Sequence, residues 1–567
     1  MPGRLGVARP IDRSMKKGRR ITKWFVLALT LFVASVILGR THNQDVRSVT
    51  FSKDIAPILY QHCVECHRPG GIAPMSLLTY RDAQPFAGLL REKITKREMP
   101  PWHADPRFGE FINERRLSQE EISRIVAWLD QGAKEGDARD LPRLPQFPEQ
   151  WQIRQPDIVF TMTKSYALGP EAADKYLYFR IPTNFREDKW VQAVEFRPGN
   201  RKVVHHAVVF IETPENFAEA QRRNPSEKPG NAAWTLLETQ PSSLELMDGT
   251  TRRVKPDVPV VDDGCSASDV DAVGFGSNNA VLSVYAPGRG IDSWPEGTAK
   301  KIPAGSNLIL QMHYSKLAGR PEKDLTGVAL TFSKMPVTKI VTSRSISNVM
   351  FLIPPHTDNH KVTACWNLQR DVEFIGFMPH MHVRGKSMKY ELVYPDGRRQ
   401  TLLSVPHYDF HWQTLYSLKT PLAVSGGSKL AVTAYYDNSE RNMHNPDPSK
   451  AIRHGTATFD EMMVGFVDYI VPKPHDRVVA KIDPGIYDAY VGQYEVAPKS
   501  VLNIIRVGDR LYAEADGQRV ELYPITETIF FSNKTESELT FLKNGKGEVT
   551  GFLVTRDDKL VRVKKIK

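Results

Sequence analysis

The chain of 567 residues carries 76 Lys and Arg against 65 Asp and Glu, a formal net charge of +11. Residues 1–23 hold eight basic and one acidic residue, and residues 555–567 hold six basic and two acidic ones. The remaining chain is neutral, which excludes the basic surface of a nucleic-acid-binding protein. With 41% hydrophobic and 25% charged residues, the composition also excludes a disordered chain and a multispan membrane protein.

Residues 1–46 are predicted to form an export signal that also anchors the chain. Residues 24–39 are uncharged and follow the basic cluster, as the hydrophobic region of a signal follows its basic region. No convincing small-residue cleavage site follows, which favours an uncleaved anchor with the basic flank on the cytoplasmic side. We therefore expect an exported protein on the periplasmic side of the bacterial inner membrane, attached to it by residues 24–39.

Residues 47–137 contain helical patterns. The clearest begins at Ser118, which forms a capping-box pattern with Glu121, and ends at Gly132. Apolar residues recur within it at helical spacing, at Ile122, Ile125, Val126 and Leu129. Residues 138–156 are rich in proline and are predicted to be a linker.

The sharpest motif is Cys63-Val64-Glu65-Cys66-His67, the C-x-x-C-H pattern of covalent c-type haem attachment. Two cysteines at this spacing form thioether bonds to the haem vinyl groups, and the adjacent histidine turns its imidazole to the iron. A redox-active C-x-x-C or half a zinc site leaves the histidine unexplained. The other two cysteines, Cys265 and Cys365, form no second pair that could complete a zinc site. The motif predicts one covalently bound haem c.

The sixth iron ligand is expected downstream. Met99 is preferred because Pro100 and Pro101 can hold a ligand loop rigidly, and because methionine opposite histidine raises the reduction potential. Met75, His103, an empty ligand position and a purely structural Met99 are the alternatives. Together with the capped helix, these motifs resemble a cytochrome c domain, which implies an all-α fold for residues 47–137.

From residue 157 the pattern changes to short strands separated by turn signals, which favours two β-sandwiches, residues 157–335 and 336–472. Three histidine motifs lie on such strands. His205 and His206 are adjacent, so both can bind one ion only where the strand is bulged or ends. His313 lies on a second strand. His380 and His382 share one face by the strand period of two and can chelate a metal together.

In chain order, His205–Phe210 (HHAVVF), Leu310–Tyr314 (LQMHY), Pro379–His382 (PHMH) and Thr458–Met462 (TFDEM) resemble the copper type II, ascorbate-dependent monooxygenases. That family includes the peptidylglycine and dopamine β-monooxygenases. The resemblance implies two linked, jelly-roll-like β-sandwiches that each hold one copper. It assigns the electron-transfer copper to three histidines, His205, His206 and His313. It assigns the copper at which O2 reacts to His380, His382 and Met462, with Met463 as the alternative.

The sequence departs from that family at three positions. The peptide-amidating members bind a substrate carboxylate with an Arg, an Asn and a Tyr. At the corresponding positions this chain has Met378, Val464 and Phe466. A glycine-extended peptide is therefore not the expected substrate. Cys265 and Cys365 can form one disulfide, which suits an exported protein.

The remaining histidines are predicted to have structural roles or none. His407 and His411 lie in an aromatic segment where packing and hydrogen bonding are expected. Four others lie in polar, turn-rich stretches and are predicted to be solvated: His356, His360, His444 and His454. Residues 483–567 resemble the small lipocalin-like β-barrel domain of various bacterial exported enzymes, and no catalytic group is evident there.

The expected protein is an exported haem–copper oxidoreductase with one covalent haem c and two copper ions. Its copper centre would hydroxylate a C–H bond of a small organic substrate with O2, using electrons that reach it through the haem from an ascorbate-like reductant or a redox protein. The alternative is a non-catalytic electron-transfer or copper-binding protein on the same scaffold. A carbohydrate- or protein-binding role for the sandwiches is a third interpretation.

Overall fold

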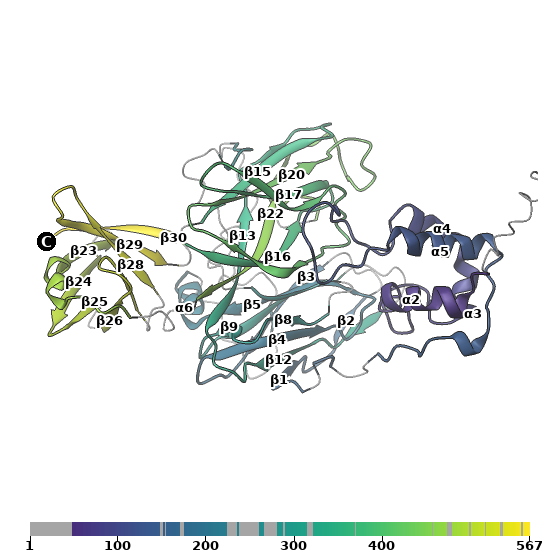
Figure 1. The fold of residues 1–567 in the computed structure, drawn as a ribbon, viewed down its shortest axis with the longest axis horizontal. Coiled ribbons are helices and arrows are strands. Elements are labelled where there is room, and N and C mark those ends of the chain that lie inside the picture. Colours follow the sequence, from purple (N-terminus) through teal and green to yellow (C-terminus); the bar gives the residue numbers. More distant parts are fainter. Residues whose placement is uncertain are drawn as a thin grey trace, which may run out of the picture.

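A computed structural model gives three parts: a helical unit, a central body of β-sheets and a terminal barrel (Figure 1). Within the described residues, no helix is long and apolar enough to cross a membrane. The anchor predicted at residues 24–39 lies outside them. The structure describes residues 48–147, 151–153, 155–169, 175–223, 235–237, 260–265, 281–286, 290–314, 321–368, 370–455, 458–472, 479–497, 500–515, 518–532, 537–556 and 559–567.

The helical unit lies at one end of the molecule (Figure 1). The predicted capping box is confirmed, because the Ser118 and Glu121 side chains each accept a hydrogen bond from the other residue's backbone N–H. The core of the unit is built around Phe51 and Trp128, which are fully buried. The elements are η1 (Phe51–Ile55), α2 (Ala56–His62), α3 (Tyr80–Ala83), η2 (Gln84–Phe86), α4 (Ala87–Thr95), α5 (Gln119–Asp130) and η3 (Ala138–Asp140).

The largest sheet runs through both predicted sandwiches. Strand β9 (Thr298–Ile302) pairs in parallel with β13 (Lys339–Ser347), and this pairing joins the strands on its two sides into one nine-stranded sheet. The two sandwiches therefore share a layer rather than being connected by chain alone. The other strands of this sheet are β1 (Ile158–Thr161), β4 (Lys189–Arg197), β8 (Asp292–Ser293), β12 (Gly327–Phe332), β16 (Val372–His380), β19 (Tyr416–Val424) and β22 (Val464–Pro472).

Two smaller sheets cover this layer. A five-stranded sheet consists of β3 (Lys175–Pro182), β5 (Val204–Glu212), β6 (Thr235–Leu237), β7 (Val281–Tyr285) and β10 (Asn307–Tyr314). A four-stranded sheet consists of β15 (His360–Asn367), β17 (Gly385–Val393), β18 (Arg399–Val405) and β20 (Lys429–Tyr436). The remaining central elements are β2 (Tyr166–Leu168), β11 (Glu322–Asp324), β14 (Leu352–Ile353), β21 (Ile452–Arg453) and α6 (Pro214–Arg223).

Each smaller sheet encloses its own hydrophobic core against the shared layer. Leu308 and Leu310 of β10 pack with Val328 and Leu330 of β12 in the first core. Val432 of β20 packs with residues of β16 and β22 in the second. Every second side chain along these strands points inward. The apolar side chains that point inward from facing sheets form the two cores. Cys265 and Cys365 form a disulfide, with Cα atoms 5.0 Å apart, at the second sandwich.

The helical unit is docked on the second sandwich by the segment that follows α4. Trp102 is buried, and its ring lies 4.9 Å from that of Tyr416 on β19. Phe111 completes the cluster, 5.5 Å from Tyr416, and forms a β-bridge with Leu418. The side chain of Asn113 donates to the carbonyl of Leu415 at 2.6 Å.

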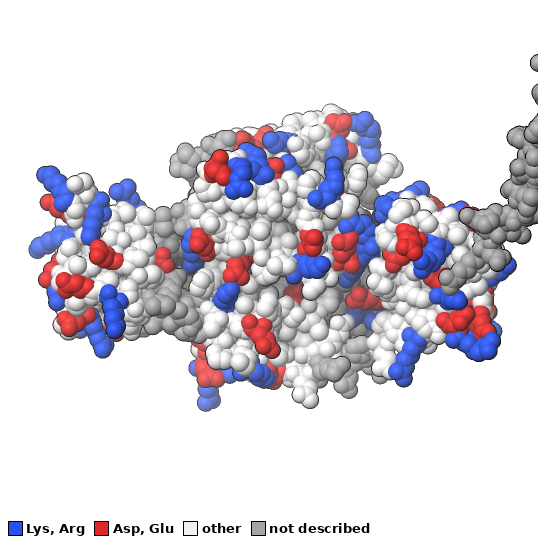
Figure 2. All heavy atoms as spheres, viewed as in Figure 1, with Lys and Arg blue, Asp and Glu red and all other residues white. Residues whose placement is uncertain are grey.

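The C-terminal part is a closed eight-stranded barrel, and this confirms the predicted barrel-like domain. Buried aromatic rings fill it, among them Tyr490, Tyr494 and Phe541. Figure 2 shows acidic and basic side chains interspersed over the visible face of all three parts. The elements are η7 (Pro484–Ala489), β23 (Gly492–Ala497), β24 (Ser500–Val507), β25 (Arg510–Ala515), β26 (Gln518–Pro524), β27 (Ile529–Phe531), β28 (Glu538–Lys543), β29 (Val549–Arg556) and β30 (Lys559–Lys565).

Candidate metal centres

Three histidines from neighbouring strands β5 and β10 converge on one point. His206 lies directly opposite His313, while Val204 lies opposite Tyr314, so His205 is the extra residue of a β-bulge. The bulge that adjacent histidines require is therefore present. The Nδ1 atoms of His205 and His313 lie 3.1 and 3.2 Å from the Nδ1 atom of His206.

The donor atoms of this first histidine group all lie within 4.8 Å of one another, a spacing that can hold a metal ion. Burial lowers the pKa of His313 to about 3 and lowers the pKa of His206 well below its usual value, with further lowering by neighbouring imidazoles. Both rings are therefore neutral near pH 7, the form that binds metals. The ring of Tyr176 stacks on His313 at 4.3 Å and fixes its plane.

The second histidine group lies at the end of β16. The rings of His380 and His382 are 5.5 Å apart and nearly perpendicular. Nδ1 of His380 lies 2.9 Å from Oε1 of Gln413, and Nδ1 of His382 lies 3.2 Å from the carbonyl oxygen of Asp460. Since both partners can only accept, each Nδ1 carries the proton and each Nε2 is left with its lone pair for a metal.

Glu461 ties Met462 to this second group. The buried carboxylate accepts the backbone N–H groups of His382 at 2.8 Å, Arg384 at 2.6 Å and Met462 at 3.2 Å. Burial raises the pKa of Glu461 to about 7. Met462 is half-buried, whereas Met463 lies fully buried in the hydrophobic core. Of the two methionines, Met462 is the one whose side chain is partly exposed.

One aromatic ring separates the two histidine groups. The centroid of Phe410 lies 6.0 Å from that of His205 and 6.0 Å from that of His382, so these two imidazoles are within about 12 Å of each other. His411 lies 5.8 Å from His205 and 6.0 Å from His444. The sequence predicted a packing role for this aromatic segment. It did not indicate that Phe410 packs against a histidine of each candidate site.

The C-x-x-C-H motif lies at the end of α2, where Cys63 caps the helix. Both thiols are free, and burial raises the pKa of Cys63 to about 12. Nδ1 of His67 lies 3.2 Å from the carbonyl oxygen of Met75 and donates to it, which leaves the Nε2 lone pair available to a metal. These residues fit a covalently attached haem.

Met99 and Met75 occupy different positions around that motif. The carbonyl oxygen of Met75 lies 3.2 Å from Nδ1 of His67, so the backbone of Met75 is beside the Nδ1 edge of the ring. Met99 is half-buried in the turn that follows α4 and precedes the docked Trp102. His103, the other alternative, lies half-buried near Asp409 and His407.

The positive charge of Arg201 also acts on the C-x-x-C-H motif. Burial raises the pKa of the Cys66 thiol, and the charges of Arg115 and Arg201 oppose that rise. Arg201 lies in the turn that precedes β5, four residues before His205. The helical unit contacts the second sandwich through Trp102.

Two of the four histidines predicted to be solvated, His360 and His454, are not. His454 follows β21 and is buried, with 1% of its surface exposed, because a β-bridge to Glu461 brings it into the interior. The prediction of a solvated His454 was wrong because the turn-rich sequence around it gives no sign of this long-range pairing. His356 is exposed and pairs with Glu440, His444 is exposed, and His360 is half-buried beside Asp262.

Residues 338–490 match the family described as copper type II ascorbate-dependent monooxygenase, C-terminal domain. The match contains His380, His382 and Met462, and the first histidine group lies outside it. Dopamine beta-hydroxylase of Rattus norvegicus is 21% identical over 370 residues, which are 62% of this chain and 50% of that protein. The enzyme of the same name from Equus caballus is 23% identical over 227 residues, which are 37% and 36% of the two chains.

Other similarities are shorter or carry no argument. Penicillin-binding protein 4* of Bacillus subtilis (strain 168) is 35% identical over 91 residues, 16% of this chain and 20% of that protein. The chain thus spans half or less of the length of these curated relatives. Among solved structures, the major capsid protein P2 of bacteriophage PM2 aligns over 56% of this chain and 97% of its own, with 9% identity and a TM-score of 0.20, which is too low to indicate a shared fold.

Proposed function

We propose that this chain is an exported copper monooxygenase that also carries one covalent haem c. Its reaction would insert one atom of O2 into a C–H bond of a small organic substrate and release the other as water, with two electrons and two protons consumed. The observation that carries the proposal is the pair of histidine groups, His205 with His206 and His313, and His380 with His382, held within about 12 Å of each other around Phe410. The match of residues 338–490 and the similarity to dopamine beta-hydroxylases support copper as the metal.

The first group is suited to electron transfer. His205, His206 and His313 present three Nδ1 atoms from a rigid pair of strands, and the Tyr176 ring keeps His313 from turning. Ligands held this firmly change little in position between the two oxidation states of the metal. The reorganisation energy of electron transfer is therefore low. Copper held here would supply single electrons to the second site.

The second group is suited to the reaction with O2. His380 and His382 offer two Nε2 atoms, and the Met462 thioether favours the reduced, softer copper ion. Two nitrogen donors and one thioether leave positions open for O2 and substrate. Glu461 accepts from the backbone of both His382 and Met462, so these two donors would keep one arrangement.

The surroundings of the second group support a substrate without a carboxylate. Phe466, at one position where peptide-amidating enzymes grip their substrate, lies 6.3 Å from His380. Met378 and Val464, at the other two, are buried apolar residues. None of the three can pair with an anion. We therefore propose a small, uncharged or cationic organic substrate.

The helical unit would hold the haem through Cys63, Cys66 and His67, with Met99 as the sixth ligand. A haem attached there would relay electrons from an ascorbate-like reductant or a redox protein. The electrostatic influence of Arg201, four residues before His205, on Cys66 supports the first histidine group as the acceptor. Residues 24–39 would anchor the protein on the periplasmic side of the inner membrane, the compartment in which covalent haem and the Cys265–Cys365 disulfide form.

The proposal is tested by comparing two histidine variants in the same sandwich. O2 uptake is measured with ascorbate and a panel of small molecules that carry activated C–H bonds. His382→Ala is expected to abolish substrate-dependent uptake and to leave the haem absorption spectrum unchanged. His356→Ala, at an exposed histidine, is expected to retain uptake. Retained turnover in His382→Ala would refute a reaction at this site, and bound copper without substrate-coupled uptake in the wild type would favour a non-catalytic copper protein.

A further inference from the structure

Residues 406–413, between β18 and β19, contact both the backbone and the side chains of the second histidine group. Gln413 accepts the Nδ1 proton of His380 at 2.9 Å. The hydroxyl of Tyr408 donates to the carbonyl of Met381 at 2.8 Å and accepts the backbone N–H of the same residue at 3.1 Å. We call residues 406–413 the bridging segment.

The bridging segment also reaches both histidine groups through one ring. Phe410 is 8% exposed and contacts His382 edge to face and His205 in a stacked arrangement. Each of the residues 380, 381 and 382 therefore has its own partner in the bridging segment. No residue of the segment is one of the proposed ligands.

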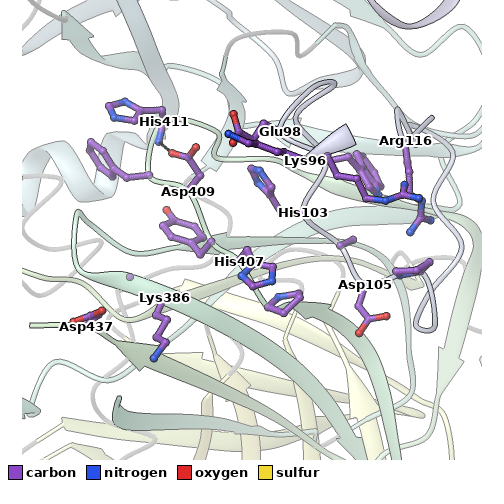
Figure 3. A pocket seen from close by; sticks show the side chains of 18 of the residues that line it. Lys96, Glu98, His103, Asp105, Arg116, Lys386, His407, Asp409, His411 and Asp437 are labelled. Atoms are coloured by element: carbon purple, nitrogen blue, oxygen red, sulfur yellow. Dashed lines mark hydrogen bonds between the residues drawn. The ribbon is translucent and has the colours of Figure 1, made fainter. Parts of the chain in front are cut away.

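The bridging segment also borders a cleft shared with the helical unit (Figure 3). His103 of the helical unit points into this cleft together with His407 and Asp409 of the bridging segment (Figure 3). Tyr416, which comes three residues after Gln413, hydrogen-bonds the backbone of His103 and packs on Trp102. The helical unit thus contacts the chain shortly after the bridging segment.

Gln413 is held in place for its contact with His380. Its side chain is 5% exposed, and its amide nitrogen lies 3.4 Å from the carbonyl oxygen of Phe410. This bond orients the amide so that the oxygen, rather than the nitrogen, faces His380. A neutral acceptor at this point selects the His380 tautomer with its proton on Nδ1 and its lone pair on Nε2.

We propose that Gln413 is a positioning residue for the second metal site. The inference rests on the proposed function, since it requires copper at His380 and His382. Without the Gln413 acceptor, the His380 ring can turn about its side-chain bonds and can present either nitrogen, so copper binding becomes weaker and heterogeneous.

The test compares Gln413→Leu, which removes the acceptor at similar size, with Gln413→Glu, which keeps an acceptor oxygen. Copper affinity is measured by competition with a chelator, and Cu(II) geometry by electron paramagnetic resonance. Gln413→Leu is expected to bind one of its two copper ions about 10- to 100-fold more weakly and to give a broadened signal for that ion. Gln413→Glu is expected to restore one defined signal. Gln400→Leu, at an exposed glutamine that accepts from Tyr394, is the control and is expected to behave as wild type.

The outcomes separate the two proposals. Two copper ions in the wild type, with unchanged affinity and spectrum in Gln413→Leu, would overturn the positioning role and leave the proposed function intact. A wild type that binds no copper would overturn both. A heterogeneous signal in Gln413→Leu that Gln413→Glu corrects is specific to hydrogen bonding, because a general packing defect would persist in the Glu variant.

Discussion

The Nδ1 atoms of His206 and His313 lie 3.2 Å apart, at a position where strands β5 and β10 place the two residues directly opposite each other. Two imidazoles at this distance cannot both be protonated without strong repulsion. The pair is buried, with 6% of His206 and 1% of His313 exposed. The fold thus holds two neutral nitrogen donors face to face before any metal arrives, and His205 on the bulge adds the third.

Removing one member of this pair should empty one site and spare the other. His313→Ala is expected to reduce bound copper from two ions to one per chain, because two imidazoles from a bulged strand cannot hold copper as tightly as three. Metal analysis after dialysis against a weak chelator measures this. The matched control is His356→Ala, which should keep two ions; loss of both ions from His313→Ala would instead indicate that the sites do not bind independently.

Burial of His313 should make the copper-free protein sensitive to acid. Its pKa in the folded chain is about 3, below the usual value near 6.5 that applies to the unfolded chain. As the pH falls from 6.5 towards 3, the unfolded chain takes up a proton that the folded chain does not, so stability is lost over this window. Urea unfolding between pH 7.5 and 4.5 should show a falling midpoint.

The matched variant for this effect is His313→Asn, which keeps a polar side chain but cannot titrate. Its unfolding midpoint should depend less steeply on pH than that of the wild type over the same range. Equal slopes for the two proteins would show that the His313 imidazole does not titrate differently in the folded and unfolded chains.

Glu461→Gln should destabilise the second site. One carboxylate oxygen accepts from His382 and Met462 and the other from Arg384, so an amide NH2 in either place leaves at least one buried backbone N–H without its acceptor. We expect a loss of about 1–3 kcal/mol in the free energy of unfolding. Denaturant unfolding measures it, with Glu440→Gln at an exposed carboxylate as the control, for which a change of similar size would refute the special role of Glu461.

Trp102→Ala should loosen the helical unit from the second sandwich. Trp102 is 7% exposed and packs against both Phe111 and Tyr416, so its removal leaves a cavity in the interface. Core Trp→Ala changes cost about 3–5 kcal/mol. Limited proteolysis should cut residues 103–117 faster than in the wild type. Ile112→Ala, at a neighbour with 74% of its surface exposed, should leave the cleavage rate unchanged.

Local sequence patterns predicted the local features of this protein. The capping box at Ser118 and Glu121 appears as expected, because it depends on residues three positions apart. The alternation of strand residues led to the requirement for a bulge or a strand end at His205 and His206, and the register of β5 and β10 shows a bulge. The barrel was expected from the resemblance of residues 483–567 to lipocalin-like domains, and the structure shows that it has eight strands.

Long-range contacts could not be predicted in the same way. Gln413 and His380 are 33 residues apart, and nothing in the residues between them indicates the hydrogen bond. The buried state of His454 and the acceptor role of Glu461 depend on a β-bridge between two irregular segments. The parallel pairing of β9 with β13, which joins the two sandwiches, likewise depends on tertiary packing rather than on the pattern of either strand.

The proposed function requires one chain to hold a covalent haem and two copper ions. The most direct measurement is elemental analysis combined with the haem absorption spectrum, on protein matured in a host that exports it and attaches haem. We predict one iron and two copper ions per chain, and a haem that stays with the polypeptide after denaturation. A fully folded protein without copper, or with haem that denaturation releases, would contradict the proposed function.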